Sequence, residues 1–149
     1  MMPLIAAAAC AASFTTVAQW EGAAPAWVVS FSHVPYGQQR PDFVRMATDR
    51  KLDVAEWLPL RPGSADRRWR TWYTDLGDEA IRPLVARLRE EHDERGIGSL
   101  LEIAGEIARL RPEWRPTPLQ RSELMRAADS LCDPSRRARA LEVLQLALR

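Results

Sequence analysis

Apolar residues recur at helical spacing through much of this 149-residue chain, and the pattern is densest between residues 64 and 92. Trp69, Trp72, Tyr73 and Leu76 stand at positions i, i+3, i+4 and i+7, which places four large side chains on one stripe of a helix. Each aromatic side chain can bury about 150–250 Å². We therefore expect a helix here, with its tryptophans mostly buried in the centre of the core.

The same periodicity, together with proline and capping signals, predicts helices along most of the chain. The expected helices cover 4–20, 25–34, 42–58, 64–76, 78–95, 99–110, 117–131 and 133–149. Residues 27–34 have the β-branched and aromatic content of a strand, but they have no evident pairing partner. A turn is expected at Pro35-Tyr36-Gly37 and a helix end at Gly96. The pattern predicts an all-α fold, a compact bundle of six or seven helices.

Charge divides the chain into two parts within one expected domain, residues 1–149. Residues 1–39 form an almost uncharged N-terminal segment in which Glu21 is the only Asp, Glu, Lys or Arg. Residues 40–149 form an Arg-rich helical body that holds all 21 basic residues, of which only Lys51 is a lysine. The net charge is +1, so no global field draws the protein to nucleic acid or to a membrane. A GC-rich coding sequence would give the same arginine bias.

The N-terminus and the two cysteines bear on the compartment. The apolar run from Leu4 to Ala12 is too short for a bilayer, which takes about 20 residues, and no Lys or Arg precedes it. We interpret it as part of a buried helix, although a targeting role for residues 1–18 stays open. Cys10 and Cys132 lie far apart in the sequence, and we expect both to be reduced in a cytoplasmic protein that does not enter a membrane.

No group of residues has the spacing of a catalytic or metal site. The acidic run 90–94 contains one histidine but no second histidine at ligand spacing, and we expect it to be a solvated helix end. The glycines around Ile97 lack the lysine of a phosphate-binding loop, and a helix end followed by a Ser99–Glu102 capping box explains them. We therefore expect no catalytic residue, no metal and no cofactor, and the protein is not predicted to be an enzyme.

Arginine clusters beside aromatic residues are the remaining candidates for function. Eight arginines are predicted to contact nucleic acid: Arg67, Arg68, Arg70, Arg111, Arg115, Arg136, Arg137 and Arg139. The last three fall in the first turns of a helix, where cations oppose the helix dipole at a cost of about 0.3–1 kcal/mol each. Asp133 precedes them, and no further carboxylate occurs before Glu142, so an external phosphate would relieve the conflict. The alternative is a solvated face whose arginines pair with nearby carboxylates such as Glu113.

In size, helicity and Arg-lined faces, the whole chain is similar to the helical small subunits of multisubunit CRISPR effector complexes. That resemblance is one of architecture and rests on no motif. It implies a non-catalytic subunit that contacts other protein subunits through residues 1–39 and the backbone of RNA or single-stranded DNA through its arginines. The rival hypothesis is a protein-interaction module, such as an immunity, adaptor or phage inhibitor protein, with Trp20, Trp27 and Trp57 as exposed anchors.

Overall fold

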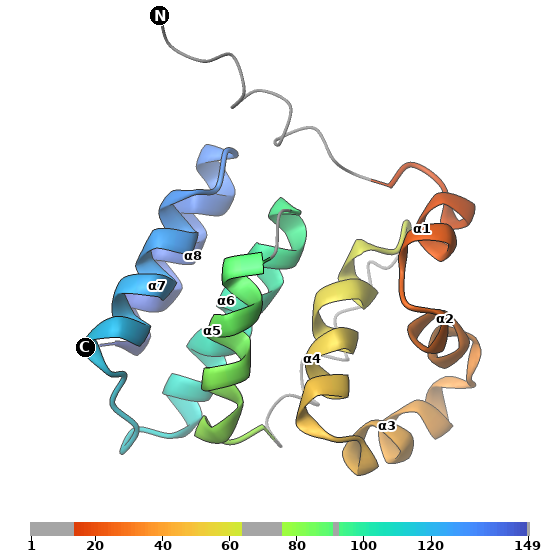
Figure 1. Ribbon diagram of the computed structural model, residues 1–149, viewed down its shortest axis with the longest axis horizontal. Helices are drawn as coiled ribbons and strands as arrows, with labels where there is room; N and C mark the ends of the chain where they lie inside the picture. The colour runs from red at the N-terminus through yellow and green to blue at the C-terminus, as the bar shows by residue number, and fades with distance from the viewer. Residues whose placement is uncertain (1–13, 64–75, 91–92, 149) are drawn as a thin grey trace, which may run out of the picture.

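The computed structural model describes residues 14–63, 76–90 and 93–148. The described part contains eight α-helices and no strand, which confirms the all-α fold class (Figure 1). The helices are α1 (Val17–Ala23), α2 (Ala26–His33), α3 (Tyr36–Arg45), α4 (Thr48–Trp57), α5 (Ile81–Glu90), α6 (Glu94–Leu110), α7 (Pro118–Asp129) and α8 (Pro134–Ala147). Short 3-10 turns, η1 (Leu58–Leu60) and η3 (Asp78–Ala80), follow α4 and precede α5.

The long helix α6 is the centre of the fold. It packs against α4 on one side and α8 on the other, and it also contacts α5 and α7 (Figure 1). Its buried face includes Leu100, Ile103, Ala104 and Ile107. Their spacing of i, i+3, i+4 and i+7 is what the sequence predicts for one inward face. Ile97 and Leu101 are also buried, so neighbours cover α6 on more than that face. The short helices α1, α2 and α3 lie at the end of the molecule away from α7 and α8 (Figure 1).

The N-terminal helices are shorter than the sequence predicts, because the chain bends sharply between them. Residues 4–13 of the helix expected at 4–20 lie outside the described residues. In the described part, α1 begins at Val17, after a capping box in which Thr16 and Gln19 bond to each other's backbone N–H groups. The expected turn at 35–37 is wrong, since Pro35 is the N-cap of α3 and the next two residues are helical. The single helix expected at 42–58 is two helices. Met46 and Ala47 are extended (ψ 150° and 154°) and separate α3 from α4.

The predicted boundary near residue 96 is also wrong. Helix α5 ends at Glu90, and α6 starts at Glu94 with Asp93 as its N-cap, whose carboxylate accepts from the N–H groups of Arg95 and Gly96. Gly96 and Ser99 therefore lie inside α6 rather than in a cap. Ser99 is buried, and its hydroxyl donates to the carbonyl of Ala55 at 2.6 Å. That bond ties α6 to α4.

Three other expected helices begin where the sequence predicts. The helix predicted after Pro25 instead of a strand is α2. Thr117 caps α7 in a capping box with Gln120, and Asp133 caps α8 through the N–H groups of Ser135 and Arg136. Helix α8 is less enclosed than predicted. Its buried residues on the described side chains are Ala140 and Leu144, with Leu148 just beyond its end.

Buried apolar residues form two clusters. The main cluster joins α4 to α8 and reaches Phe31 and Phe43. The second cluster contains Trp20, Ala24, Val28 and Leu60, and it holds α1 and α2 against the turn that follows α4. The tryptophans at positions 69 and 72, around which the core was expected to form, lie outside the described residues. No described helix combines the length and the apolar character that crossing a membrane requires.

Gly105 marks the closest approach of α6 and α8. A Cβ atom added there would lie 2.2 Å from Cγ1 of Val143, whereas one added at Gly98 in the same helix meets nothing within 4 Å. We expect Gly105→Ala to lower the free energy of unfolding, because an overlap costs about 1–3 kcal/mol, more than the helix-propensity gain of about 1 kcal/mol. Gly98→Ala should instead raise it. Urea denaturation of both variants checks this, and a stabilised Gly105→Ala would contradict the close packing.

Candidate interaction surfaces

The predicted arginine site is divided by the structure. Arg67, Arg68 and Arg70 lie outside the described residues. Arg111 is half-buried, and Arg115 is exposed on the connector between α6 and α7, where its guanidinium donates to the carbonyl oxygens of Pro112 and Trp114. Both arginines therefore lie at the connector between α6 and α7, far along the chain from the N-terminal helices.

The three arginines at the start of α8 have partners within the chain. Arg136 pairs with Glu94 at 3.1 Å, and Arg139 pairs with Glu102 at 3.1 Å. Arg137 donates to the carbonyl of Leu131 at 2.9 Å. The premise that Asp133 is the only carboxylate near these cations is wrong, because Glu94 and Glu102 of α6 also pair with them. Their contact with nucleic acid stays a prediction, but the helix dipole no longer demands one.

Glu94 is the residue that sequence reasoning missed here. Its side chain is buried at the start of α6, although the acidic run 90–94 was expected to be a solvated helix end. One carboxylate oxygen accepts from the backbone N–H groups of Cys132 and Asp133, and the other accepts from Arg136. The N-terminus of α8 therefore receives two carboxylates, its own cap at Asp133 and Glu94 from the neighbouring helix.

Four other cations lie on α3 and in the first turn of α4. We call Arg40, Arg45, Arg50 and Lys51 the α3–α4 corner. None of them forms an ion pair with a carboxylate of the described residues. The three arginines are exposed and the lysine is half-buried. The span 40–51 contains four basic and two acidic residues, Asp42 and Asp49, so this corner carries a local positive charge.

Aromatic rings support two of these cations. The guanidinium carbon of Arg50 lies 4.9 Å from the ring centroid of Trp27 in α2, and Nζ of Lys51 lies 5.6 Å from the ring of buried Phe43 in α3. Both distances are within the range of cation–π attraction. The rings fix the side-chain stems and leave the charges unneutralised, which preserves their capacity to bind an anion.

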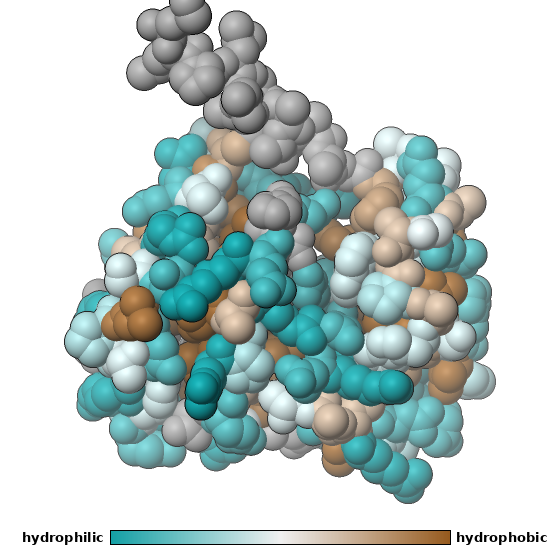
Figure 2. Space-filling view, in the orientation of Figure 1, coloured by the Kyte–Doolittle hydropathy of each residue, from teal (hydrophilic) through white to brown (hydrophobic). Residues whose placement is uncertain are grey.

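The outer face of α3 continues this surface. Tyr36 and Val44 are 45% and 48% exposed, and they flank Arg40 at four-residue spacing on the helix. In Figure 2, hydrophilic and hydrophobic side chains lie side by side over α3 and the adjoining end of α4. The four-residue spacing of Tyr36, Arg40 and Val44 in the sequence could have identified this face. The turn expected at 35–37 placed Tyr36 outside any helix, so the spacing was not recognised.

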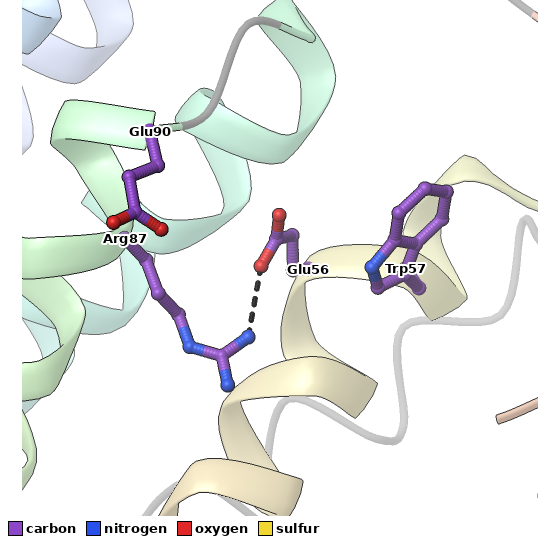
Figure 3. A pocket seen from close by; sticks show the side chains of 4 residues that line it. All are labelled: Glu56, Trp57, Arg87 and Glu90. Carbon is purple, nitrogen blue, oxygen red and sulfur yellow. Dashed lines mark hydrogen bonds and ion pairs between the residues drawn. The ribbon is translucent and has the colours of Figure 1, made fainter. Parts of the chain in front are cut away.

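A pocket of about 300 Å³ opens between the C-terminal ends of α4 and α5, lined by Glu56, Trp57, Arg87 and Glu90 (Figure 3). Arg87 crosses from α5 to α4. Its Nη1 donates to the carboxylates of Asp53 and Glu56, and its Nη2 donates to a backbone carbonyl of α4 at 2.8 Å. Among the described residues that line the pocket there is no serine, cysteine or histidine.

Two surface carboxylate–arginine pairs change the pKa of one partner. A hydrogen bond from Arg126 lowers the pKa of Glu123, and a hydrogen bond to Glu106 raises the pKa of Arg109. Both are exposed i, i+3 pairs and mark no functional site. Within the described part of the chain, no group of three or more His, Cys, Asp and Glu residues could hold a metal ion.

Cys132, in the loop between α7 and α8, is disulfide-bonded. The expectation of a reduced thiol is therefore wrong at this position. Disulfides persist in oxidising compartments, so the cysteines do not support a cytoplasmic location.

No protein-family model, no curated protein and no solved structure matches this chain. The function must therefore be argued from the residues and contacts described above.

Proposed function

We propose that the protein is a non-catalytic helical subunit of a nucleoprotein assembly, and that it binds the backbone of RNA or single-stranded DNA through the α3–α4 corner. The observation that carries this proposal is the group of four unneutralised cations at 40–51. Phosphates attract such cations and release counterions when they bind. The architectural similarity to CRISPR small subunits agrees with this function and stays a prediction.

The neighbouring aromatic groups favour a single strand over a duplex. Tyr36 is exposed beside the corner, and Trp27 is half-buried beneath Arg50. Unpaired bases stack on aromatic rings while cations follow the phosphates, and such stacking contributes about 1–3 kcal/mol per base.

The uncharged N-terminal segment, residues 1–39, supplies the second contact, which is with a partner protein. Its one acidic residue, Glu21, lies 3.3 Å from His33 on the next helix.

The test removes the four charges and compares the result with a variant of the same net charge. We expect the variant Arg40→Gln, Arg45→Gln, Arg50→Gln and Lys51→Gln to bind a 12-nucleotide single-stranded RNA about tenfold more weakly or worse at low salt, because four phosphate contacts are lost. Fluorescence anisotropy measures the affinity, and circular dichroism verifies the fold.

The matched control carries four exposed arginines changed to Gln elsewhere: Arg82, Arg89, Arg109 and Arg126. It should bind nearly as tightly as the original protein, since it has the same net charge as the test variant but keeps the α3–α4 corner. Equal losses in both variants would contradict a localised site and indicate attraction by net charge alone.

A protein-interaction module is the second candidate, and one observation favours it. Tyr36 and Val44 are two of the three large apolar residues that the described surface exposes most, and both lie on the outer face of α3. The anchors expected for this function are different from those in the structure. Trp20 is fully buried, and Trp27 and Trp57 are half-buried. If the unaltered protein does not bind RNA or single-stranded DNA at low salt, this second function replaces the first.

A further inference from the structure

The pocket between α4 and α5 is lined by two carboxylates, Glu56 and Glu90, which would not contribute to binding nucleic acid. We propose that it binds one small organic cation, the alkylguanidinium or alkylammonium group of an arginine or lysine side chain or of a free amine. This inference is independent of the proposed nucleic-acid contact, since phosphates are anions and would be repelled here.

The sum of charges around the pocket is negative. Among the described residues, Glu56 and Glu90 line the pocket with one cation, Arg87, which also pairs with a third carboxylate, Asp53, behind the lining. Arg87 does not serve as a receptor for an anion, because both of its terminal nitrogens already donate to α4. It holds the wall of the pocket in place and fixes the position of Glu56.

Glu56 gives the pocket a specific acceptor. The residue is only 7% exposed, and its Oε2 accepts from Arg87 at 3.0 Å. The other carboxylate oxygen has no hydrogen-bond partner among the described residues and points away from Arg87 (Figure 3). A carboxylate oxygen that accepts no hydrogen bond from the protein can accept one from a charged donor, and charge-assisted hydrogen bonds are the stronger kind. Glu90, exposed at the end of α5, adds a second carboxylate at the pocket.

Trp57 supplies the apolar part of the lining. It is half-buried next to Glu56 at the end of α4, and its ring can receive the cation and the alkyl chain. The volume of about 300 Å³ is at the lower end of small-molecule sites, which suits one cationic head group and a short chain.

The experiment uses ethylguanidinium and its uncharged analogue ethylurea as probes, at constant ionic strength. The readout is the indole N–H signal of Trp57 in a proton–nitrogen correlation spectrum, assigned by its loss in Trp57→Phe. We expect ethylguanidinium to shift this signal saturably and ethylurea to leave it unchanged. Glu90→Gln should weaken binding about 2- to 5-fold, as expected for an exposed ion pair. Glu90→Lys should abolish it by placing a competing cation at the pocket.

Glu142→Gln is the control, since Glu142 is exposed on α8 and outside the pocket. It should bind ethylguanidinium like the original protein, and thermal unfolding confirms that all variants are folded. Equal shifts from the two probes, or equal affinities of Glu90→Gln and Glu142→Gln, would overturn the proposal. N-acetylarginine methylamide distinguishes the sources: tighter binding than ethylguanidinium assigns the site to a side chain of a partner, and equal binding assigns it to a free amine.

Discussion

Replacement of Glu94 by Ala is expected to lower the free energy of unfolding by about 1–3 kcal/mol, the cost of leaving poorly solvated donors without their acceptor. Three donors lose their acceptor at once: the N–H groups of Cys132 and Asp133, and the guanidinium of Arg136. Since Glu94 is only 7% exposed, water cannot easily replace it. Urea denaturation at constant pH, followed by circular dichroism, measures the loss.

Glu102→Ala is the matched control, because Glu102 is also an α6 carboxylate that pairs with an arginine of α8. That pair is largely exposed, with side-chain exposures of 58% for Arg139 and 26% for Glu102. An exposed pair contributes only about 0.2–1 kcal/mol, so the control should be much the milder variant. Equal losses in the two variants would contradict the view that Glu94 anchors the start of α8.

Replacement of Trp20 by Ala is expected to cost about 3–5 kcal/mol, the range for a large aromatic removed from a core. Trp20 is 0% exposed and is the largest member of the second apolar cluster. Its Nε1 donates to the carbonyl of Trp57 at 2.8 Å, and the guanidinium of Arg61 lies 5.9 Å from its ring centroid. The loss should be measured as the free energy of unfolding in urea. Amide hydrogen exchange should also become faster in α1 and α2.

Trp20→Phe separates the ring from the hydrogen bond. It keeps most of the apolar contact and removes the Nε1 donor, so we expect a smaller loss that includes about 1 kcal/mol for the hydrogen bond. A Trp20→Ala variant that unfolds within about 0.5 kcal/mol of the original would mean that this cluster does not hold α1 and α2.

Local signals predicted the starts of some helices correctly. At Thr117 and Asp133, an N-cap residue stands directly before a proline, and both side chains accept from N–H groups within three residues. Such contacts depend only on neighbours in the sequence, so the sequence is sufficient to find them. The choice of helix over strand for residues 26–33 was also correct, because no second strand was available to pair with them.

Errors occurred where tertiary contacts override local preference. Pro41 has no N–H to donate to the carbonyl of Gly37, so local rules start the helix after it, yet α3 continues through it. Contacts made by Gln39 with the carbonyls of Phe31 and Val34 hold this helix against the end of α2. Glycine often ends a helix, but the N-cap at Asp93 places Gly96 in the first turn of α6.

The candidate site was less predictable than the fold. The partner of Arg136 is Glu94, 42 residues away, and no local pattern identifies such a pair. Three cations of the α3–α4 corner, Arg45, Arg50 and Lys51, fall in the single helix expected at 42–58, which the structure divides into α3 and α4, and Arg40 precedes that range. Their common surface becomes evident only when the bend at Met46 and Ala47 is known.

The dependence of single-strand binding on salt concentration tests the proposed function most directly. If the four cations of the α3–α4 corner each meet one phosphate, the logarithm of the association constant should fall with the logarithm of salt concentration with a slope of about −2 to −3. A slope near zero, or no binding at 50 mM salt, would contradict the nucleic-acid function.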